Sequence, residues 1–246
     1  MMEFINLGNA SLAAQYVAIE LFREIKRNPH TKLGLATGGT MEPVYAALVK
    51  LIKSNPVNLS HLKTFNLDEY FELDKQSPQS YLYYMKHHLF NHIDIKPEQY
   101  YFPDNDRENL AENNKAYDEL IMKEHPVNLQ LLGIGTNGHI GFNEPGTSFT
   151  SNTRMVDLSE ETIRANARFF DTIDQVPTQA VTMGITTIMQ SDRIILLATG
   201  EKKQPIIQQL YGMTQPDEDI PASVLLNHPN ALIITDDEAS PYKKKD

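Results

Sequence analysis

Residues 131–148, LLGIGTNGHIGFNEPGTS, are the stretch on which the fold prediction rests. An apolar run over residues 127–132 leads into it and stops at Gly133, Gly135 and Gly138. This pattern is typical of a buried strand that delivers a loop to the carboxyl edge of a sheet. The loop carries polar side chains that could converge on one small ligand: Asn137, His139, Asn143 and Glu144. We expect a site here, the alternative being a glycine-rich surface turn that contains a histidine.

The segments on either side of this loop repeat the order strand, turn, helix. Further apolar runs of strand length cover residues 32–36, 62–67, 193–198 and 231–235, with a shorter one at 98–102. Helices are predicted over residues 12–25, 44–52, 81–90, 109–123, 160–170, 179–189 and 221–226, and an extended segment over 152–158. This alternation predicts an α/β fold, with a mostly parallel, open, Rossmann-like sheet and helices on both faces. We expect a single α/β catalytic domain spanning residues 1–246.

The composition is that of an ordinary globular protein of 246 residues, with 41% apolar and 22% charged residues. It contains no cysteine, which excludes disulfides and thiolate metal sites and is consistent with a cytoplasmic location. We recognise no signal peptide, and no apolar run approaches the roughly 20 residues of a membrane helix. The net charge of −10 argues against a general nucleic-acid surface. We therefore expect a small-molecule partner, with no nucleic acid and no membrane.

A second glycine turn follows the strand expected at residues 32–36. It consists of Thr37, Gly38, Gly39 and Thr40 and enters the helix expected at 44–52. Backbone N–H groups, two hydroxyls and the positive end of a helix dipole can together bind a phosphate. The Gly-Lys-Ser/Thr ending of a Walker A loop is missing, and a tight connection without a ligand is the alternative.

Basic residues close to these loops would supply charge for a bound anion. Arg164 and Arg168 lie four residues apart and form a candidate clamp, although solvated helix arginines are common. A further glycine turn, TGEKK at residues 199–203, brings Lys202 and Lys203 to the end of the strand expected at 193–198.

Two adjacent carboxylates, Asp68 and Glu69, follow the strand expected at residues 62–67. A carboxyl group that is partly buried has a raised pKa, which would suit a general base. Capping of a helix or turn is the alternative, and the spacing alone does not separate the two interpretations.

Two patterns that suggest other ligands fail on their context. Residues 133–138 match G-x-G-x-x-G, and Asp157 follows about 20 residues later, where a ribose-binding acid belongs. However, residues 139–150 lack the helical periodicity that should follow the third glycine, so we expect no nicotinamide or flavin. His88 and His92 have the i, i+4 spacing of a metal pair but no acidic third ligand, which favours a solvated or packed helix face. We expect neither a cofactor nor a metal.

Taken together, five segments in the same order resemble the glucosamine-6-phosphate deaminase (isomerase) family. They are ATGGT at 36–40, FNLDEY at 65–70, GIGTNGHIGFNEP at 133–145, RANARFF at 164–170 and the glycine-lysine turn at 200–203. The resemblance covers nearly the whole chain and implies the α/β fold of the deaminases and phosphogluconolactonases. It also implies a hydrolase of amino-sugar and N-acetylglucosamine degradation, which converts D-glucosamine 6-phosphate to D-fructose 6-phosphate and ammonia.

The resemblance assigns roles to individual residues. Asp68 matches the base that moves a proton from C2 to C1, His139 the acid/base that opens the sugar ring, and Glu144 its carboxylate partner. The phosphate-binding residues match Thr37, Gly38, Gly39, Thr40, Arg168 and Lys203, with Lys202 as the alternative to Lys203. The residue types suit the chemistry, because an imidazole exchanges protons near pH 7 and a carboxylate can accept a proton that a neighbouring aldehyde makes acidic.

Two positions depart from the family pattern. Many relatives have aspartate where Asn137 stands, and an amide cannot exchange a proton at neutral pH, so we expect its carbonyl to position His139. Arg154 keeps one basic residue of the allosteric site found in some hexameric relatives, but a lysine two positions later is Val156 here. We therefore expect a low order for any homo-oligomer, without activation by N-acetylglucosamine 6-phosphate.

The competing functions are a 6-phosphogluconolactonase-like hydrolase of sugar phosphates and a sugar-phosphate sensor without chemistry. A lactonase needs no base at C2, so Asp68 favours the deaminase. A sensor would be favoured by the loss of Asp68 or His139, and both are present. Residues 149–170 are a candidate lid that would bring Arg168 over the phosphate.

Overall fold

The structure, a computed structural model, describes residues 2–123 and 125–242. Its strands are β1 (Glu3–Asn6), β2 (Lys32–Leu35), β3 (Lys63–Asn66), β4 (Asp68–Tyr70), β5 (Tyr100–Tyr101), β6 (Leu129–Leu132), β7 (Arg154–Asp157), β8 (Gln179–Thr182), β9 (Ile194–Ala198) and β10 (Ala231–Thr235). Its α-helices are α1 (Ala10–Arg27), α2 (Glu42–Ser54), α3 (Tyr81–His88), α4 (Leu110–Met122), α5 (Glu160–Asn166), α6 (Ile185–Met189) and α7 (Gln204–Gly212). Short 3-10 helices are η1 (Phe90–His92), η2 (Pro97–Gln99), η3 (Ala167–Phe169), η4 (Ile173–Gln175), η5 (Glu201–Lys203) and η6 (Pro221–Asn227).

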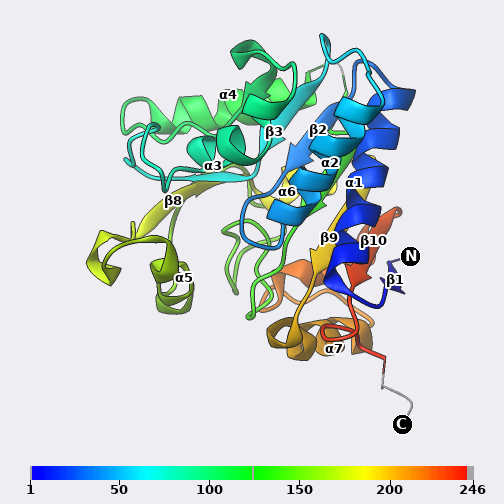
Figure 1. Cartoon of the computed structure of the whole chain (residues 1–246). Helices are drawn as coiled ribbons and strands as arrows, with labels where there is room; N and C mark the ends of the chain where they lie inside the picture. The colour runs from blue at the N-terminus through cyan, green and yellow to red at the C-terminus, as the bar shows by residue number, and fades with distance from the viewer. Residues whose placement is uncertain (1, 124, 243–246) are drawn as a thin grey trace.

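A seven-stranded parallel sheet forms the centre of the fold, in the order β1-β10-β9-β6-β2-β3-β5. Every residue of β2, β6, β9 and β10 is buried, because the sheet is covered on both faces. Helices α1 and α2 lie side by side in front of the sheet, and α4 lies behind it (Figure 1). The predicted mostly parallel sheet with helices on both faces is therefore confirmed.

Local sequence explains where the first helices begin. The Asn9 side chain accepts a hydrogen bond from the backbone N–H of Leu12 at 3.0 Å and so caps α1. The buried face of α1, which includes Val17 and Leu21, then packs on the sheet. Helix α2 has a proline in its first turn, Pro43, whose missing N–H costs nothing at that position.

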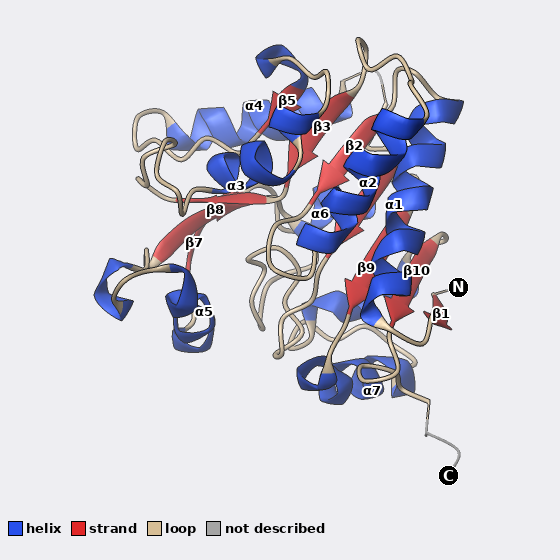
Figure 2. Ribbon diagram, in the orientation of Figure 1, coloured by secondary structure: helices blue, strands red, loops and turns tan. Residues whose placement is uncertain are grey.

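A second, three-stranded sheet projects from the edge of the first in the order β4-β8-β7, with both pairs antiparallel (Figure 2). Leu67 alone separates β3 from β4, so the chain passes directly from one sheet into the other. Asp68 is the first residue after this junction and pairs with Thr182 of β8. The junction places the Asp68 carboxylate at the carboxyl edge of the large sheet.

The prediction of a helix over residues 179–189 was wrong. Its first half is strand β8, which pairs with β4 and β7, and only Ile185–Met189 is helical. An apolar run of this length does not distinguish a strand from a helix, so tertiary pairing decides. Gly184 lies at the break between the strand and the helix. The chain packs so closely there that a Cβ atom would lie 2.2 Å from the Ser151 carbonyl oxygen.

Two smaller differences concern strand β1 and the segment 160–170. Strand β1 was not predicted; it is the edge strand beside β10. The helix expected over 160–170 ends at Asn166 and continues as the 3-10 turn η3. No helix in the described ranges is long and apolar enough to cross a bilayer.

Candidate active site

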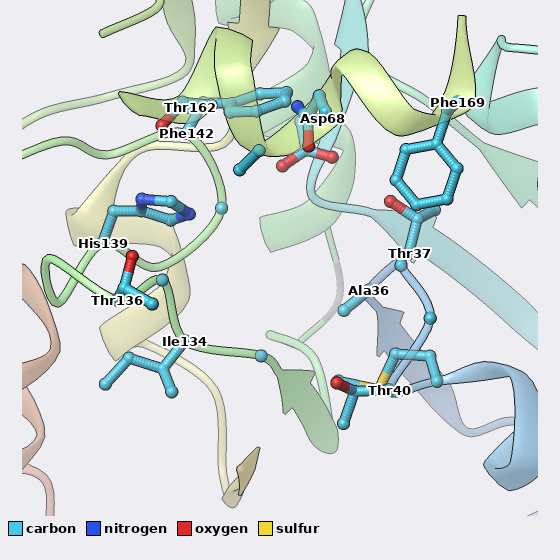
Figure 3. A pocket seen from close by; sticks show the side chains of 18 of the residues that line it. Ala36, Thr37, Thr40, Asp68, Ile134, Thr136, His139, Phe142, Thr162 and Phe169 are labelled. Atoms are coloured by element: carbon cyan, nitrogen blue, oxygen red, sulfur yellow. The ribbon is translucent and has the colours of Figure 1, made fainter. Parts of the chain in front are cut away.

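A cavity of about 910 Å³ opens at the carboxyl edge of the parallel sheet. Its walls come from the turns that follow β2 and β9, the start of β4, the loop after β6, and α5 with η3. It is lined by every predicted site residue except Glu144: Thr37, Gly38, Gly39, Thr40, Asp68, Asn137, His139, Arg168 and Lys203. Figure 3 shows Asp68 and His139 facing the same cavity, with Thr37 and Thr40 at its other end. Segments far apart in the sequence therefore meet at one site.

The glycine turn after β2 is built as a polar cradle. Gly38 has φ +109°, a backbone conformation that other residues rarely adopt, and its carbonyl accepts the Tyr84 hydroxyl at 2.8 Å. The same carbonyl accepts the N–H of Met41 at 2.9 Å, which turns the chain into α2. A Cβ atom on Gly39 would have open space around it, so the backbone here faces the cavity. The turn can accept an anion at the start of a helix.

Asp68 presents a buried carboxyl group to the cavity and is only 7% exposed. Burial, with a smaller contribution from the nearby charge of Glu69, raises the pKa of Asp68 from 3.8 to about 8. Among the described residues, no group donates a hydrogen bond to this carboxylate that would lower its pKa. The ionised form of a carboxyl group with such a pKa is a far stronger base than an ordinary carboxylate, which suits proton abstraction from carbon.

Glu69 takes the capping role that was the alternative for this pair. Its carboxylate accepts the backbone N–H groups of Tyr70 at 2.9 Å, Tyr81 at 2.9 Å and Leu82 at 3.0 Å. The last two belong to the first turn of α3, so Glu69 fastens this helix to β4. Burial still raises the pKa of Glu69, although these hydrogen bonds oppose the shift. Glu69 therefore caps the helix, and Asp68 is the carboxyl group of the two that lines the cavity.

His139 and Glu144 form a pair at the opposite wall. His139 Nδ1 lies 3.5 Å from Glu144 Oε2, and Glu144 stands behind the imidazole, away from the cavity lining. Burial tends to raise the pKa of Glu144, but the nearby His139 ring, with hydrogen bonds from Thr162 and Asn137, lowers it to about 2. The Glu144 carboxylate therefore stays ionised beside the imidazole ring.

Asn137 connects the two members of this pair. Its Nδ2 donates to Glu144 Oε2 at 2.8 Å, and its Oδ1 accepts the backbone N–H of His139 at 3.2 Å. The Asn137 carbonyl, which we expected to position His139, contacts the backbone of that residue and not its ring. The NH2 group of the same side chain holds the Glu144 carboxylate.

The glycines of this loop give space to the histidine. A Cβ atom on Gly135 would lie 2.3 Å from two atoms of the His139 ring. The N–H of Gly135 donates to the His139 carbonyl at 2.9 Å, so the loop turns back on itself. Gly135 thus seats the imidazole, and the loop does not open a helix as a dinucleotide site requires.

Two basic side chains reach the cavity from other elements. Lys203 of η5 is partly buried and donates to the Ile134 carbonyl at 2.6 Å, whereas Lys202 is exposed. Burial, and then the neighbouring charge of Arg168, lowers the pKa of Lys203. Arg168 of η3 stacks over the Phe169 ring at 4.7 Å, while Arg164 forms an exposed ion pair with Glu160. All three basic side chains therefore line the cavity, and the neighbouring charges that act on each other are those of Arg168 and Lys203.

Sequence reasoning missed two groups of residues around the site. Ser159 and Thr162 of α5 donate to Glu144 Oε1, the first at 3.1 Å. The only sequence feature that pointed to these two residues was a serine, Ser159, in the N-cap position before a helix. An aromatic cluster also lines the cavity next to Asp68, and no local pattern identifies it: Tyr70, Tyr81, Phe142 and Phe170.

The histidine pair on α3 and η1 lies apart from this cavity. The His92 Nε2 atom lies 2.7 Å from the His87 carbonyl oxygen, and the His88 ring packs against Tyr84. In the part of the chain that the structure describes, no group of three or more His, Cys, Asp or Glu side chains is placed to hold a metal ion.

Comparison with protein families matches residues 9–234 to the model of glucosamine-6-phosphate isomerases and 6-phosphogluconolactonases. A glucosamine-6-phosphate deaminase of Staphylococcus saprophyticus is 49% identical over 241 residues, which cover 98% of this chain and 99% of that protein. The enzyme of the same name from Staphylococcus aureus strain Newman is 47% identical, with coverage of 98% and 95%.

Solved structures show the same relationship. A monomeric glucosamine-6-phosphate deaminase superposes with a TM-score of 0.94 and 42% sequence identity, over 97% of this chain and 98% of that chain. A 6-phosphogluconolactonase of Thermotoga maritima superposes with a TM-score of 0.75 but only 18% identity, over 96% and 100% of the two chains. The second similarity establishes a common fold alone.

Proposed function

The chain belongs to the family of glucosamine-6-phosphate isomerases and 6-phosphogluconolactonases, and we propose that it converts D-glucosamine 6-phosphate to D-fructose 6-phosphate and ammonia. The observation that carries this proposal is the placement of two different acid/base groups in one cavity. Asp68 is a strong base for a carboxylate, and His139 with Glu144 forms an oriented imidazole pair. Together they suit a reaction with two separate proton transfers on one sugar.

Ring opening is the role we assign to His139. It takes the proton from the C1 hydroxyl of the cyclic sugar and returns a proton to the ring oxygen, which leaves an aldehyde at C1 and a hydroxyl at C5. Glu144 stabilises the imidazolium form between these steps because its own carboxylate stays ionised. Asn137 holds the carboxylate in place and exchanges no proton.

Isomerisation and deamination are the role we assign to Asp68. The C1 aldehyde makes the C2 proton acidic, and Asp68 removes it; the electron pair forms the C1=C2 double bond of an enolamine while the carbonyl π electrons move to the C1 oxygen, which takes a proton from water. Asp68 then returns its proton to C1, and the amine nitrogen gives up a proton to water as its lone pair forms the C2=N bond of an imine. Water adds to this imine and ammonia leaves, so one substrate and one water yield fructose 6-phosphate and ammonia. No hydride is transferred in this sequence.

The phosphate is assigned to the other end of the cavity. The turn from Thr37 to Thr40 offers backbone N–H groups and hydroxyls, and Arg168 and Lys203 supply positive charge. We prefer Lys203 to Lys202 because Lys203 is partly buried at the cavity wall and Lys202 is exposed.

The proposal favours the deaminase over a lactonase or a sensor. A lactonase has no use for a base at C2, and a sensor has no use for a carboxyl group whose burial raises its pKa to about 8. Structures named as 6-phosphogluconolactonases share the fold at 16–20% identity, whereas the relatives at 47–50% identity are named deaminases.

Assembly, location and motion are further parts of the proposal. A similar solved deaminase is described as monomeric, which supports a low oligomeric order here, and Val156 supports the absence of an allosteric site. We assign the chain to the cytoplasm as one catalytic domain, with residues 149–170 as a lid that carries Arg168. Limited proteolysis of this segment with and without inorganic phosphate tests the lid.

The function is tested by supplying glucosamine 6-phosphate to the purified protein and measuring ammonia and fructose 6-phosphate. Equal amounts of both products are expected. Folded protein that releases no ammonia would refute the proposal, and hydrolysis of 6-phosphogluconolactone instead would identify the lactonase.

A further inference from the structure

Both oxygens of the Glu144 carboxylate are held by neighbouring side chains. Oε2 accepts from Asn137 at 2.8 Å and lies 3.5 Å from His139 Nδ1, within the loop that follows β6. Oε1 accepts the hydroxyls of Ser159 and Thr162, which come from the first turn of α5. The carboxylate therefore joins two segments of different origin.

Thr162 is placed to fix the orientation of this carboxylate. It is 4% exposed, so water competes little for its hydroxyl. Ser159 holds the same turn by accepting the Thr162 backbone N–H at 3.2 Å. A second link runs from the Thr136 hydroxyl to Glu161 at 2.5 Å, so α5 and the loop are joined at a further point.

We propose that Thr162 is a positioning residue for ring opening, which rests on the function proposed above. By donating to Oε1 it keeps the carboxylate turned so that Oε2 faces His139. The side chain exchanges no proton and acts through Glu144. Without it, Oε1 keeps only the Ser159 hydroxyl as a donor, so the carboxylate is held less firmly beside the imidazole.

The same segment carries Arg168 and Phe169 one turn further on, in η3. Contact with the substrate phosphate through Arg168 and orientation of Glu144 through Thr162 therefore depend on one position of this segment. In this structure the segment lies against the loop and holds the Glu144 carboxylate beside His139.

Thr162→Val tests the inference, because it replaces the hydroxyl by a methyl group of similar size and leaves Ser159 as the N-cap. For glucosamine 6-phosphate we expect kcat to fall about 10-fold, part of the roughly 10²- to 10⁴-fold that positioned acid–base groups contribute, with KM within about twofold. The second probe is the open-chain alditol made by reducing the C1 aldehyde, 2-amino-2-deoxyglucitol 6-phosphate. It needs no ring opening, so its Kd should stay within about twofold of the wild-type value.

Two further variants separate positioning from packing. Thr162→Ser keeps the hydroxyl and should retain kcat within about threefold of wild type. Thr187→Val is the matched control, since Thr187 is also 4% exposed and donates to a carboxylate, Asp118, at 2.7 Å outside the cavity. It should leave kcat unchanged.

The inference is overturned if Thr162→Val keeps wild-type kcat, or if Thr162→Ser falls as far as the valine variant. It is also overturned if binding of the alditol weakens as much as kcat falls, because the role would then be packing of the segment. If the valine variant does not fold, Thr162→Ala against Thr162→Ser makes the same comparison. Failure of the wild-type protein to release ammonia would instead refute the proposed function.

Discussion

Replacing Asp68 by asparagine should stabilise the folded protein while it removes the activity. The wild-type carboxyl is buried, and its pKa is raised from 3.8 to about 8. At about 1.36 kcal/mol per pH unit, a shift of about four units corresponds to an upper limit of roughly 5–6 kcal/mol in the free energy of unfolding. Because the cavity admits water, we expect about half of this, roughly 2–3 kcal/mol. Asparagine has nearly the same shape and carries no charge.

The dependence of this effect on pH has a definite sign. Below about pH 3.8 Asp68 is protonated in both the folded and the unfolded chain, so the variant gains nothing. Between about pH 4 and pH 8 the folded chain holds a proton that the unfolded chain has lost, so the wild type loses stability as pH rises. Above about pH 8 both states are ionised and the difference between wild type and variant is constant.

Urea unfolding of both proteins at pH 5, 6.5 and 8.5 measures the difference. The advantage of Asp68→Asn should grow across this series and raise the melting temperature by roughly 5–10 °C at the highest pH. Turnover should fall at least about 10³-fold. Asp94→Asn, which changes an exposed carboxyl, is the control and should stay within about 0.5 kcal/mol of wild type. A difference that is absent, or the same at every pH, would refute the raised pKa. Near-normal turnover would refute the assignment of the base.

Other substitutions test the rest of the site. Asn137→Asp places a second carboxylate within hydrogen-bond distance of Glu144, so the pKa of one of the two carboxyl groups must rise. We expect turnover to change only about two- to fivefold, while the acid limb of the pH–rate profile moves to higher pH. An unmoved acid limb would count against this coupling. Gly135→Ala places a methyl group against the His139 ring and should lower kcat at least about 10²-fold with a smaller change in KM, measured by ammonia release. Lys203→Met should raise KM for the sugar phosphate about 10-fold or more, and a KM that stays the same would remove Lys203 from the phosphate site.

Much of the fold was predictable because it depends on local patterns. The apolar runs that became β2, β6, β9 and β10 are short, continuous and bounded by glycine or polar residues, as strands buried on both faces must be. The helix prediction over 179–189 was wrong because this segment depends on contacts distant in the sequence. Its apolar residues fit either state, and pairing of β8 with β4 and β7 decided the outcome.

The candidate site likewise contains residues that the sequence indicated and residues that it did not. Residue type and strand-end position indicated Asp68, His139 and Glu144, because proton transfer needs carboxylates and imidazole at the edge of a parallel sheet. The hydroxyl of Thr162 had no such signal, since a threonine in the first turn of a helix is ordinary. Its contact with Glu144 exists only because α5 folds back over the loop after β6.

The sequence by itself determined the strand–turn–helix order, the glycine turns and the set of reactive side chains, since each of these depends on neighbours along the chain. Only the tertiary structure decided that Asp68 faces the cavity while Glu69 caps α3. The two residues are adjacent and chemically alike, so no local rule separates them. The turn from β3 into the second sheet, set by pairing of β4 with β8 far along the chain, gives one carboxylate to the site and the other to the helix.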